Sequence, residues 1–394
     1  MMDATVRTGR PPRLPVLAHG IAATVLVGLY VTLFLEAESQ SAVLGLLAVG
    51  AAAAVVAARS GVGTRVIEVL EHHPVAMGLL AAVLVLMETW LFAERHFVLL
   101  MITTYLLYVT VGLGLTIQFG YAGTLNFAGA SFYGVGSYTA AVLTAVPGFP
   151  PLLAIPAGGL VAAVCGSLLV APVLRTRGHY AAVVSIAFAL LFKTFLEVNE
   201  VLGGPQGLLV GSLSVAGYDF AAPLRPWPGT EWSFYVHHVL AALLLALFAY
   251  AVARRIEHSW LGLAMDAVRM DEIAAACFGV GIERTKVVAF VWGNMLIGMA
   301  GALYATMVGF IAPNNFTFAD SLIFLSILLL GGLGSRPGLL VAAAVVVFLP
   351  EKLQLIQEYR FLLFSALVLV MLMFRPEGLV PRPPRGYPGG GGGP

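Results

Sequence analysis

The chain has 394 residues, of which 60% are hydrophobic and 10% charged; its formal net charge is +1. Its mean hydropathy is +0.94, well above what soluble domains reach. This composition excludes a soluble globular domain and predicts an all-α polytopic membrane protein with about 10–12 transmembrane helices, some short or discontinuous. The near-neutral charge argues against a nucleic-acid partner, and Cys165 and Cys277 have neither metal-ligand nor redox spacing. We therefore expect no metal site.

Apolar segments long enough to approach the roughly 20 residues of a membrane span follow one another along the chain. The first half contains seven, near Leu14–Leu35, Ser41–Ala58, Val75–Phe92, Phe97–Ile117, Phe127–Val146, Leu152–Leu174 and Tyr180–Val198. Four further regions lie near His238–Ala253, Val287–Phe310, Asp320–Pro350 and Phe361–Phe374. The sequence GGLGSRPG, from Gly331 to Gly338, interrupts the third of these regions, which predicts either two tilted helices or a re-entrant pair.

Basic residues in short loops indicate the orientation in the membrane. They occur at Arg7–Arg13, Arg59/Arg65, Arg175/Arg177, Arg254–Lys286 and Arg375–Arg385. The number of predicted spans between these groups places all of them on one side. We therefore expect both termini in the cytoplasm, and Glu36/Glu38, Glu94–His96 and the segment 199–236 on the opposite side.

A glycine-rich segment, GLGLTIQFGYAGTLNFAGASFYGVGSYTAAVL, begins at Gly112. Small residues allow close packing of membrane helices, which is the simpler interpretation. The polar residues Gln118, Asn126 and Ser131 around Gly120 also indicate a discontinuity of the kind that transporters use to expose backbone to a solute. These four residues are candidates for a translocation pathway.

Ionisable residues within the predicted spans are few: Glu88, Lys193, Glu197 and Asp320. Lys193 and Glu197 are four residues apart and can neutralise each other on one helix face. If they face a cavity instead, they could meet the charged ends of an amino acid. Farther on, Gly203, Gly204, Pro205 and Gly207 predict tight turns in the outer loop.

A polar segment, 254–286, separates two apolar spans. From Met265 it predicts one amphipathic helix, with Met270, Ile273, Ala274, Cys277 and Phe278 on one face. Gly279 follows where a left-handed helix end is favoured. Such a helix could lie on membrane lipid or bind a protein; the few cationic residues around it favour a protein.

No phosphate-binding GxxxxGK[ST] motif and no clustered catalytic residues occur in the sequence. We therefore expect no catalytic residue and no bound cofactor in this chain. If transport is driven by ATP, another chain supplies the ATPase.

From about Tyr105 to Pro376 the chain resembles the permease subunits of bacterial high-affinity branched-chain amino acid ABC importers, of the LivM type. The resemblance rests on GYAGTLNFAGASFYGVGSYTAAVL, LGGPQGL, HSWLGLAMDAVRMDEIAAACFGVGIERTKVVAF and GMAGALYATMVGFIAPNNFTFADSLIFLSILLLGGLGSRPGLL, in this order. In such permeases the polar segment resembles the coupling loop that docks on the ATPase. The resemblance implies coupling roles for Arg269, Glu272, Ala274, Ala275, Gly279 and Lys286. Here Ile273 occupies the position of the consensus Glu, and Glu272 precedes it.

Composition and the resemblance together predict the organisation of the chain, and the resemblance implies a set of partners. Residues 1–95 would form an N-terminal cytoplasmic segment with accessory helices, 96–376 the permease core, and the Pro/Gly-rich residues 377–394 a disordered tail. The implied partners in a bacterial inner membrane are a second related permease, two ATP-binding cassette subunits carrying ATP and Mg²⁺, and an extracytoplasmic solute-binding protein.

Other functions remain open from the sequence. Relatives of this type move urea, short amides or other amino acids. An ion-coupled secondary transporter or channel would work without ATPases, using the ionisable residues in its spans. A membrane enzyme or scaffold is disfavoured because no catalytic set is clustered.

Overall fold

The computed structural model describes residues 14–60, 74–175, 180–215, 218–225, 231–353, 359–375, 377–380 and 382. The chain divides into two compact units, Met1–Phe92 and Ala93–Pro394. In the described part both are built of helices, and the strands are two residues long. The predicted all-α class is confirmed. The basic residues Arg7–Arg13, Arg65 and Arg177 and the tail from residue 383 lie outside the described residues.

The first unit contains α1 (Leu14–Glu36), α2 (Gln40–Ser60) and α4 (Pro74–Leu91). Thr32 Oγ1 in α1 donates a hydrogen bond to Glu88 Oε1 in α4 over 2.5 Å, and Tyr30 Oη donates to the carbonyl of Leu46 in α2 over 3.0 Å. Glu88 is buried. Its described contact therefore joins two helices within this unit.

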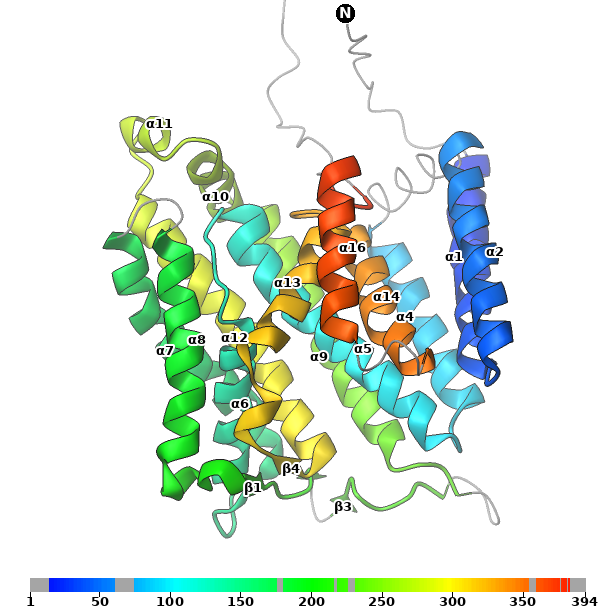
Figure 1. Ribbon diagram of the computed structural model, residues 1–394, viewed down its shortest axis with the longest axis horizontal. Coiled ribbons are helices and arrows are strands. Elements are labelled where there is room, and N and C mark those ends of the chain that lie inside the picture. Colours follow the sequence, from blue (N-terminus) through cyan, green and yellow to red (C-terminus); the bar gives the residue numbers. More distant parts are fainter. Residues whose placement is uncertain are drawn as a thin grey trace, which may run out of the picture. The chain divides into compact units, whose positions relative to one another are not determined.

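The second unit holds the remaining elements (Figure 1). They are α5 (His96–Leu115), η1 (Thr116–Tyr121), α6 (Gly129–Thr144), η2 (Pro151–Leu153), α7 (Ala154–Arg175), α8 (Tyr180–Val198), η3 (Glu200–Leu202), η4 (Gly204–Gln206), β1 (Leu208–Leu209), β2 (Ser214–Val215), β3 (Tyr218–Asp219), α9 (Tyr235–Glu257), α10 (Trp260–Met270), α11 (Glu272–Cys277), α12 (Ile282–Val308), β4 (Phe310–Ile311), η5 (Pro313–Asn315), α13 (Phe318–Gly331), α14 (Arg336–Lys352) and α16 (Arg360–Phe374).

Six helical segments in the described part of the chain are long and apolar enough to cross a membrane. They are His96–Tyr121, Pro151–Val170, Tyr180–Val198, Tyr235–Glu257, Ile282–Val308 and Pro313–Gly331. Shorter apolar helices occur at Thr24–Glu36, Gln40–Gly50, Gly78–Leu91 and Phe361–Met371. These lengths and compositions are those of a multi-pass membrane protein.

The core of the second unit is built around α12, which packs closely on α6 and α7. A Cβ atom added to Gly136 would lie 1.9 Å from the carbonyl oxygen of Gly298, and one added to Gly301 would lie 1.9 Å from that of Tyr133. Ser137 Oγ adds a hydrogen bond of 2.8 Å to the carbonyl of Gly301. Small residues let the two backbones touch, as the simpler interpretation of the glycine-rich segment predicts.

The two ends of this unit are distinct (Figure 1). At one end β1 pairs antiparallel with β4, with Leu208 opposite Ile311, and β2 pairs with β3. At the other end α10 and α11 extend beyond the helices. α5 and α9 run parallel between the two ends. His96 Nδ1 at the start of α5 lies 2.6 Å from Ser233 Oγ just before α9, and Tyr121 Oη at the end of η1, which continues α5, donates to Glu257 Oε2 at the end of α9 over 3.3 Å.

The interrupted apolar region 320–350 forms two helices, α13 and α14, which meet in a tight turn. A Cβ atom on Gly338 would lie 1.9 Å from the carbonyl oxygen of Gly331, so the two helix ends are in backbone contact. α13 starts next to β4, whereas Arg336 at the start of α14 pairs with Glu257 at the end of α9 over 2.9 Å. α13 therefore runs from one end of this unit to the other, and α14 turns back, so that Pro350 and Glu351 near its end lie beside Phe97 at the start of α5.

The beginning of the C-terminal segment differs from the disorder expected after residue 376. The amides of Leu379 and Val380 donate to the carbonyls of Leu330 and Gly331, over 2.8 and 3.3 Å. The open carbonyls at the end of α13 are thereby satisfied, which gives residues 377–380 a fixed place despite their composition.

The contact between α6 and α12 yields a first prediction. In Gly136→Ala the new methyl group meets backbone, which cannot rotate away, so we expect a loss of about 1–3 kcal/mol or more in stability. The matched control is Gly129→Ala in the same helix, where the nearest atom to the new Cβ is 3.5 Å away. Thermal unfolding of the detergent-solubilised variants measures the difference. Equal midpoints for the Gly136 variant and the wild type would contradict this account of the core.

Candidate functional site

The polar segment 254–286 forms two helices, α10 and α11, where the sequence predicted one. They separate at Asp271, whose backbone is extended, with φ −158° and ψ 110°. The Asp271 carboxylate accepts the amides of Ile273 and Ala274 over 2.8 and 3.0 Å. The prediction of one continuous helix was wrong because an aspartate that satisfies the first amides of a helix starts a new one.

The predicted apolar face of this segment is exposed. Met270, Ile273 and Phe278 have 82%, 80% and 89% of their surface accessible. We call these three residues the docking surface. Exposed apolar side chains gathered in one short segment are typical of an interaction site. The helix α11 lies beyond the ends of its neighbours α7, α8 and α12 (Figure 1).

An ion pair connects the segment to the helix that follows it. Lys286 Nζ in α12 donates to Glu272 Oε1 in α11 over 2.7 Å. Gly279, with φ +79°, ends α11 in the predicted left-handed conformation, and the amides of Gly279 and Val280 donate to the carbonyls of Ala276 and Ala275. Ala275 is buried, whereas Ala274 is exposed.

The segment also touches the end of the glycine-rich region. Arg269 is exposed, but its backbone lies against Gly123: a Cβ added there would be 3.3 Å from Arg269 Cα and 2.9 Å from Arg269 Cγ. Gly123 has φ +66°, a conformation that favours glycine. Of the predicted coupling residues, the structure thus joins Glu272 to Lys286 and places Arg269 beside the loop after η1.

The discontinuity expected in the glycine-rich segment is present. α5 passes into the π-helix η1, and residues 122–128 continue without helical structure before α6 begins. Buried backbone outside a helix needs other hydrogen-bond partners. The amide and hydroxyl of Thr124 both donate to the carbonyl of Gln118 over 2.9 Å, and Ser185 Oγ and Ser321 Oγ accept the amides of Phe127 and Ala130 over 3.0 Å.

Three amide side chains meet at this discontinuity. Gln118 Nε2 donates to Asn294 Oδ1 over 2.9 Å, and Asn126 Nδ2 donates to Gln118 Oε1 over 2.8 Å and to Asn294 Oδ1 over 3.1 Å. All three are buried. We call them the amide cluster. Gly166 and Gly293 leave room for it, because Cβ atoms there would lie 2.2 Å from Asn294 Nδ2 and 2.5 Å from Gln118 Nε2.

The structure gives two of the predicted pathway residues a structural contact, while their pathway role stays a prediction. Gln118 and Asn126 contact each other and the backbone, so their observed contacts hold the discontinuity together. Ser131 is buried, and its hydroxyl has no hydrogen-bond partner among the described residues; Gly120 packs on Gly334. Asn294 was not predicted, although a lone asparagine in the apolar run of α12 was a visible signal.

Lys193 and Glu197 form the predicted ion pair, with Nζ and Oε1 3.4 Å apart. They lie near the end of α8, with side chains 33% and 39% exposed, and no described contact joins them to the amide cluster. The predicted outer turn is present as well: Gly203, Gly204 and Gly207 have φ of +82°, +52° and +77°, and Pro205 is the second residue of the short helix η4 (Gly204–Gln206).

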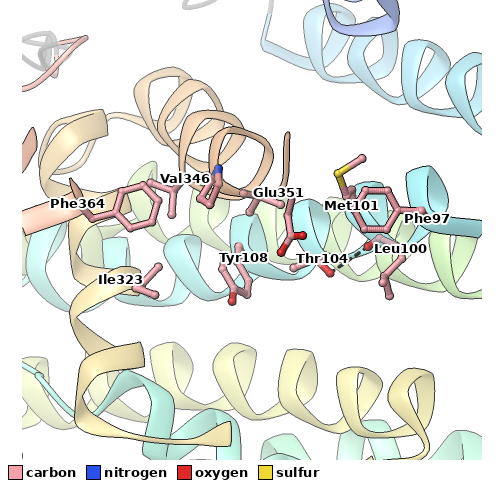
Figure 2. Close-up of a pocket in the computed structure, with 11 residues that line it drawn as sticks. Phe97, Leu100, Met101, Thr104, Tyr108, Ile323, Val346, Glu351 and Phe364 are labelled. Carbon is pink, nitrogen blue, oxygen red and sulfur yellow. Dashed lines mark hydrogen bonds between the residues drawn. The ribbon is translucent and has the colours of Figure 1, made fainter. Parts of the chain in front are cut away.

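A cavity of about 100 Å³ lies between α5, α13, α14 and α16 (Figure 2). Its walls are mostly apolar, and Glu351 points toward Thr104 and Tyr108 within it. None of the predicted pathway residues lines it.

Asp320, the remaining ionisable residue of the predicted spans, lies outside this cavity and caps α13. Its carboxylate accepts from the amide and hydroxyl of Thr317, over 3.0 and 2.6 Å.

Comparison with known proteins agrees with this architecture. Residues 97–374 match the family described as "Branched-chain amino acid transport system / permease component". The chain is 34% identical to the high-affinity branched-chain amino acid transport system permease protein LivM of Escherichia coli K12, over 77% of this chain and 74% of that protein. The corresponding Salmonella typhimurium protein is 35% identical over the same shares.

A second type of permease is related at a greater distance. The protein LivH of Escherichia coli K12 is 25% identical over 70% of this chain and 92% of its own length. No solved structure matches the chain. The match over residues 97–374 and the identity of 34–35% to two LivM proteins show the family. This chain belongs to the family of permease components of branched-chain amino acid transport systems.

Proposed function

We propose that the chain is the transmembrane permease subunit of an ATP-driven, binding-protein-dependent importer for branched-chain amino acids in the bacterial inner membrane. Family membership supports a permease. The observation that carries the ATP-driven mechanism is the exposed docking surface on a short helix tied to α12 by Lys286 and Glu272. A self-sufficient transporter has no need for such a helix.

In this mechanism the ATPase binds α11 through Met270, Ile273 and Phe278. Closure of the ATPases displaces α10 and α11. The Lys286–Glu272 pair, which joins α11 to α12, transmits this displacement to α12. α12 carries Asn294, so the movement reaches the amide cluster and the non-helical residues 122–128.

The proposed complex contains a second permease of related sequence, two ATP-binding cassette subunits and an extracytoplasmic solute-binding protein. Similarity to both LivM and LivH supports pairing of two related permeases. ATP and Mg²⁺ belong to the ATPase subunits. In this complex α10 and α11 lie on the cytoplasmic side, and β1 and β4 face the solute-binding protein. The basic loops and the number of predicted spans between them support cytoplasmic termini.

The ion-coupled alternative has less support, because the ionisable residues it would use have local partners. Glu88 accepts from Thr32, Lys193 pairs with Glu197, and Asp320 caps α13. Each of these charged groups thus has at least one local partner, although Glu88 Oε2 is buried without a hydrogen-bond partner among the described residues.

Substitutions on the docking surface test the coupling mechanism. Ile273→Asp and Phe278→Asp place a charge on side chains that are 80% and 89% exposed, so the fold is unaffected while an apolar contact is lost. We expect copurification of the ATPases with the tagged chain and ATP-dependent uptake to fall at least about tenfold, as for a central apolar contact in an interface.

The matched control is Phe278→Leu, which keeps the position apolar and should retain most of the binding. Membrane levels of all variants are measured in parallel. Wild-type ATPase recovery and uptake in both aspartate variants would exclude this surface as the coupling contact.

The substrate is tested with the complete complex in proteoliposomes, together with its solute-binding protein. We expect ATP-dependent uptake of labelled leucine that excess isoleucine or valine reduces several-fold by competition for one site, and that collapse of ion gradients leaves unchanged. Competition by urea or short amides, without competition by branched-chain amino acids, would reassign the substrate. Uptake that persists without ATP and stops when gradients collapse would favour the ion-coupled transporter.

A further inference from the structure

The C-terminal segment carries an arginine to a buried position beside the predicted coupling machinery. After α16, the hydrogen bonds of Leu379 and Val380 hold the chain against the turn between α13 and α14. Two residues later Arg382 passes over Gly334: a Cβ atom there would lie 2.8 Å from Arg382 Cδ. The side chain of Arg382 is only 10% exposed.

The Arg382 guanidinium contacts three separate elements. Nη1 lies 3.1 Å from Asp266 Oδ1 in α10 and donates to the carbonyl of Gly120 in η1 over 3.2 Å. Nη2 lies 3.4 Å from Glu257 Oε1 at the end of α9. Its centre also lies 4.9 Å from the ring centroid of Tyr121. The planar fork of arginine can make these contacts together, which the single ammonium of lysine cannot.

A second arginine completes the cluster. Arg336 Nη2 at the start of α14 lies 2.9 Å from Glu257 Oε2, which also accepts the hydroxyl of Tyr121. We call Glu257, Asp266, Arg336 and Arg382 the ionic cluster. Their side chains are between 9% and 17% exposed.

Buried ion pairs contribute little net stability, because desolvation offsets their attraction. Their better-attested role is to hold elements in one specific arrangement. Both elements that Arg382 contacts belong to the proposed coupling route. α10 leads into α11, which carries part of the docking surface, and η1 is the helix that ends at the amide cluster. Arg382 contacts both through one guanidinium.

We propose that Arg382 is a positioning residue for coupling: from the C-terminal segment it ties α10 to η1, so that displacement of the docking helices moves the discontinuous segment with them. The inference rests on the proposed ATP-driven function. It gives the C-terminal segment a part in transport, alongside the route through Lys286 and α12.

The test compares solute uptake with ATP hydrolysis in the reconstituted complex. In Arg382→Gln the subunits should still assemble and hydrolyse ATP, since the docking surface is untouched. The amount of solute taken up per ATP should fall about tenfold or more, because the guanidinium no longer ties Asp266 in α10 to Gly120 in η1. Arg382→Lys should recover part of the loss. The matched control, Arg255→Gln, removes an exposed arginine from the same end of α9 and should leave the ratio unchanged.

Two truncations separate Arg382 from the rest of the tail. A chain that ends at Pro384 keeps Arg382 and should couple normally. A chain that ends at Val380 keeps the hydrogen bonds to α13 but lacks Arg382, and it should uncouple as Arg382→Gln does.

An unchanged ratio in Arg382→Gln, or equal ratios in the two truncations, would overturn the inference. Failure of Arg382→Gln and Arg382→Lys to assemble would also overturn it, because the role would then be structural. Failure of the proposed function looks different: the wild-type complex would lack ATPases or take up solute without ATP.

Discussion

Backbone polar groups inside a bilayer have no water to bind, and this constraint shapes the whole of the second unit. The chain leaves helical structure between η1 and α6, so the groups released there need partners inside the protein. Ser185 in α8 and Ser321 in α13 accept the amides of Phe127 and Ala130, and Asn126 Oδ1 accepts the amide of Ala128. Asn294 in α12 in turn holds the side chains of Gln118 and Asn126. The glycines of α6, α7 and α12 then follow as a requirement, because these helices must come close enough for short polar side chains to reach the break.

At the end of the bundle that carries α10 and α11, the groups without partners are apolar and exposed rather than polar and buried. There large apolar side chains stand exposed in the isolated chain, whereas the charged residues nearby are partly or fully engaged, as Glu272 and Lys286 show. The usual distribution of a water-facing helix is thereby inverted. A surface of this kind is satisfied only when another protein covers it, which accords with a chain that works as one part of a complex.

Sequence reasoning recovered the features that depend on local chemistry. The left-handed Gly279, the turn at Gly203–Gly207, the Lys193–Glu197 pair and the break near Gly120 all follow from residue type and short spacing. It missed the helix break at Asp271. There the apolar periodicity favours one continuous helix, but the aspartate side chain caps a new helix instead. It could not place Asn294 beside Gln118 or Arg382 beside Asp266, because 176 and 116 residues separate the partners and only the packed fold brings them together. The pathway role of Gln118, Gly120, Asn126 and Ser131 stays a prediction.

The length of α12 has a mechanical consequence. Its 27 residues run without a break from Ile282, beside the docking helix, to Val308, next to the strand that pairs with β1. A straight helix of that length spans about 40 Å, so a tilt of about 5° shifts its far end by roughly 3.5 Å. A small rotation of α12 at one face of the membrane therefore produces, at the other face, a displacement comparable to the width of a methyl group.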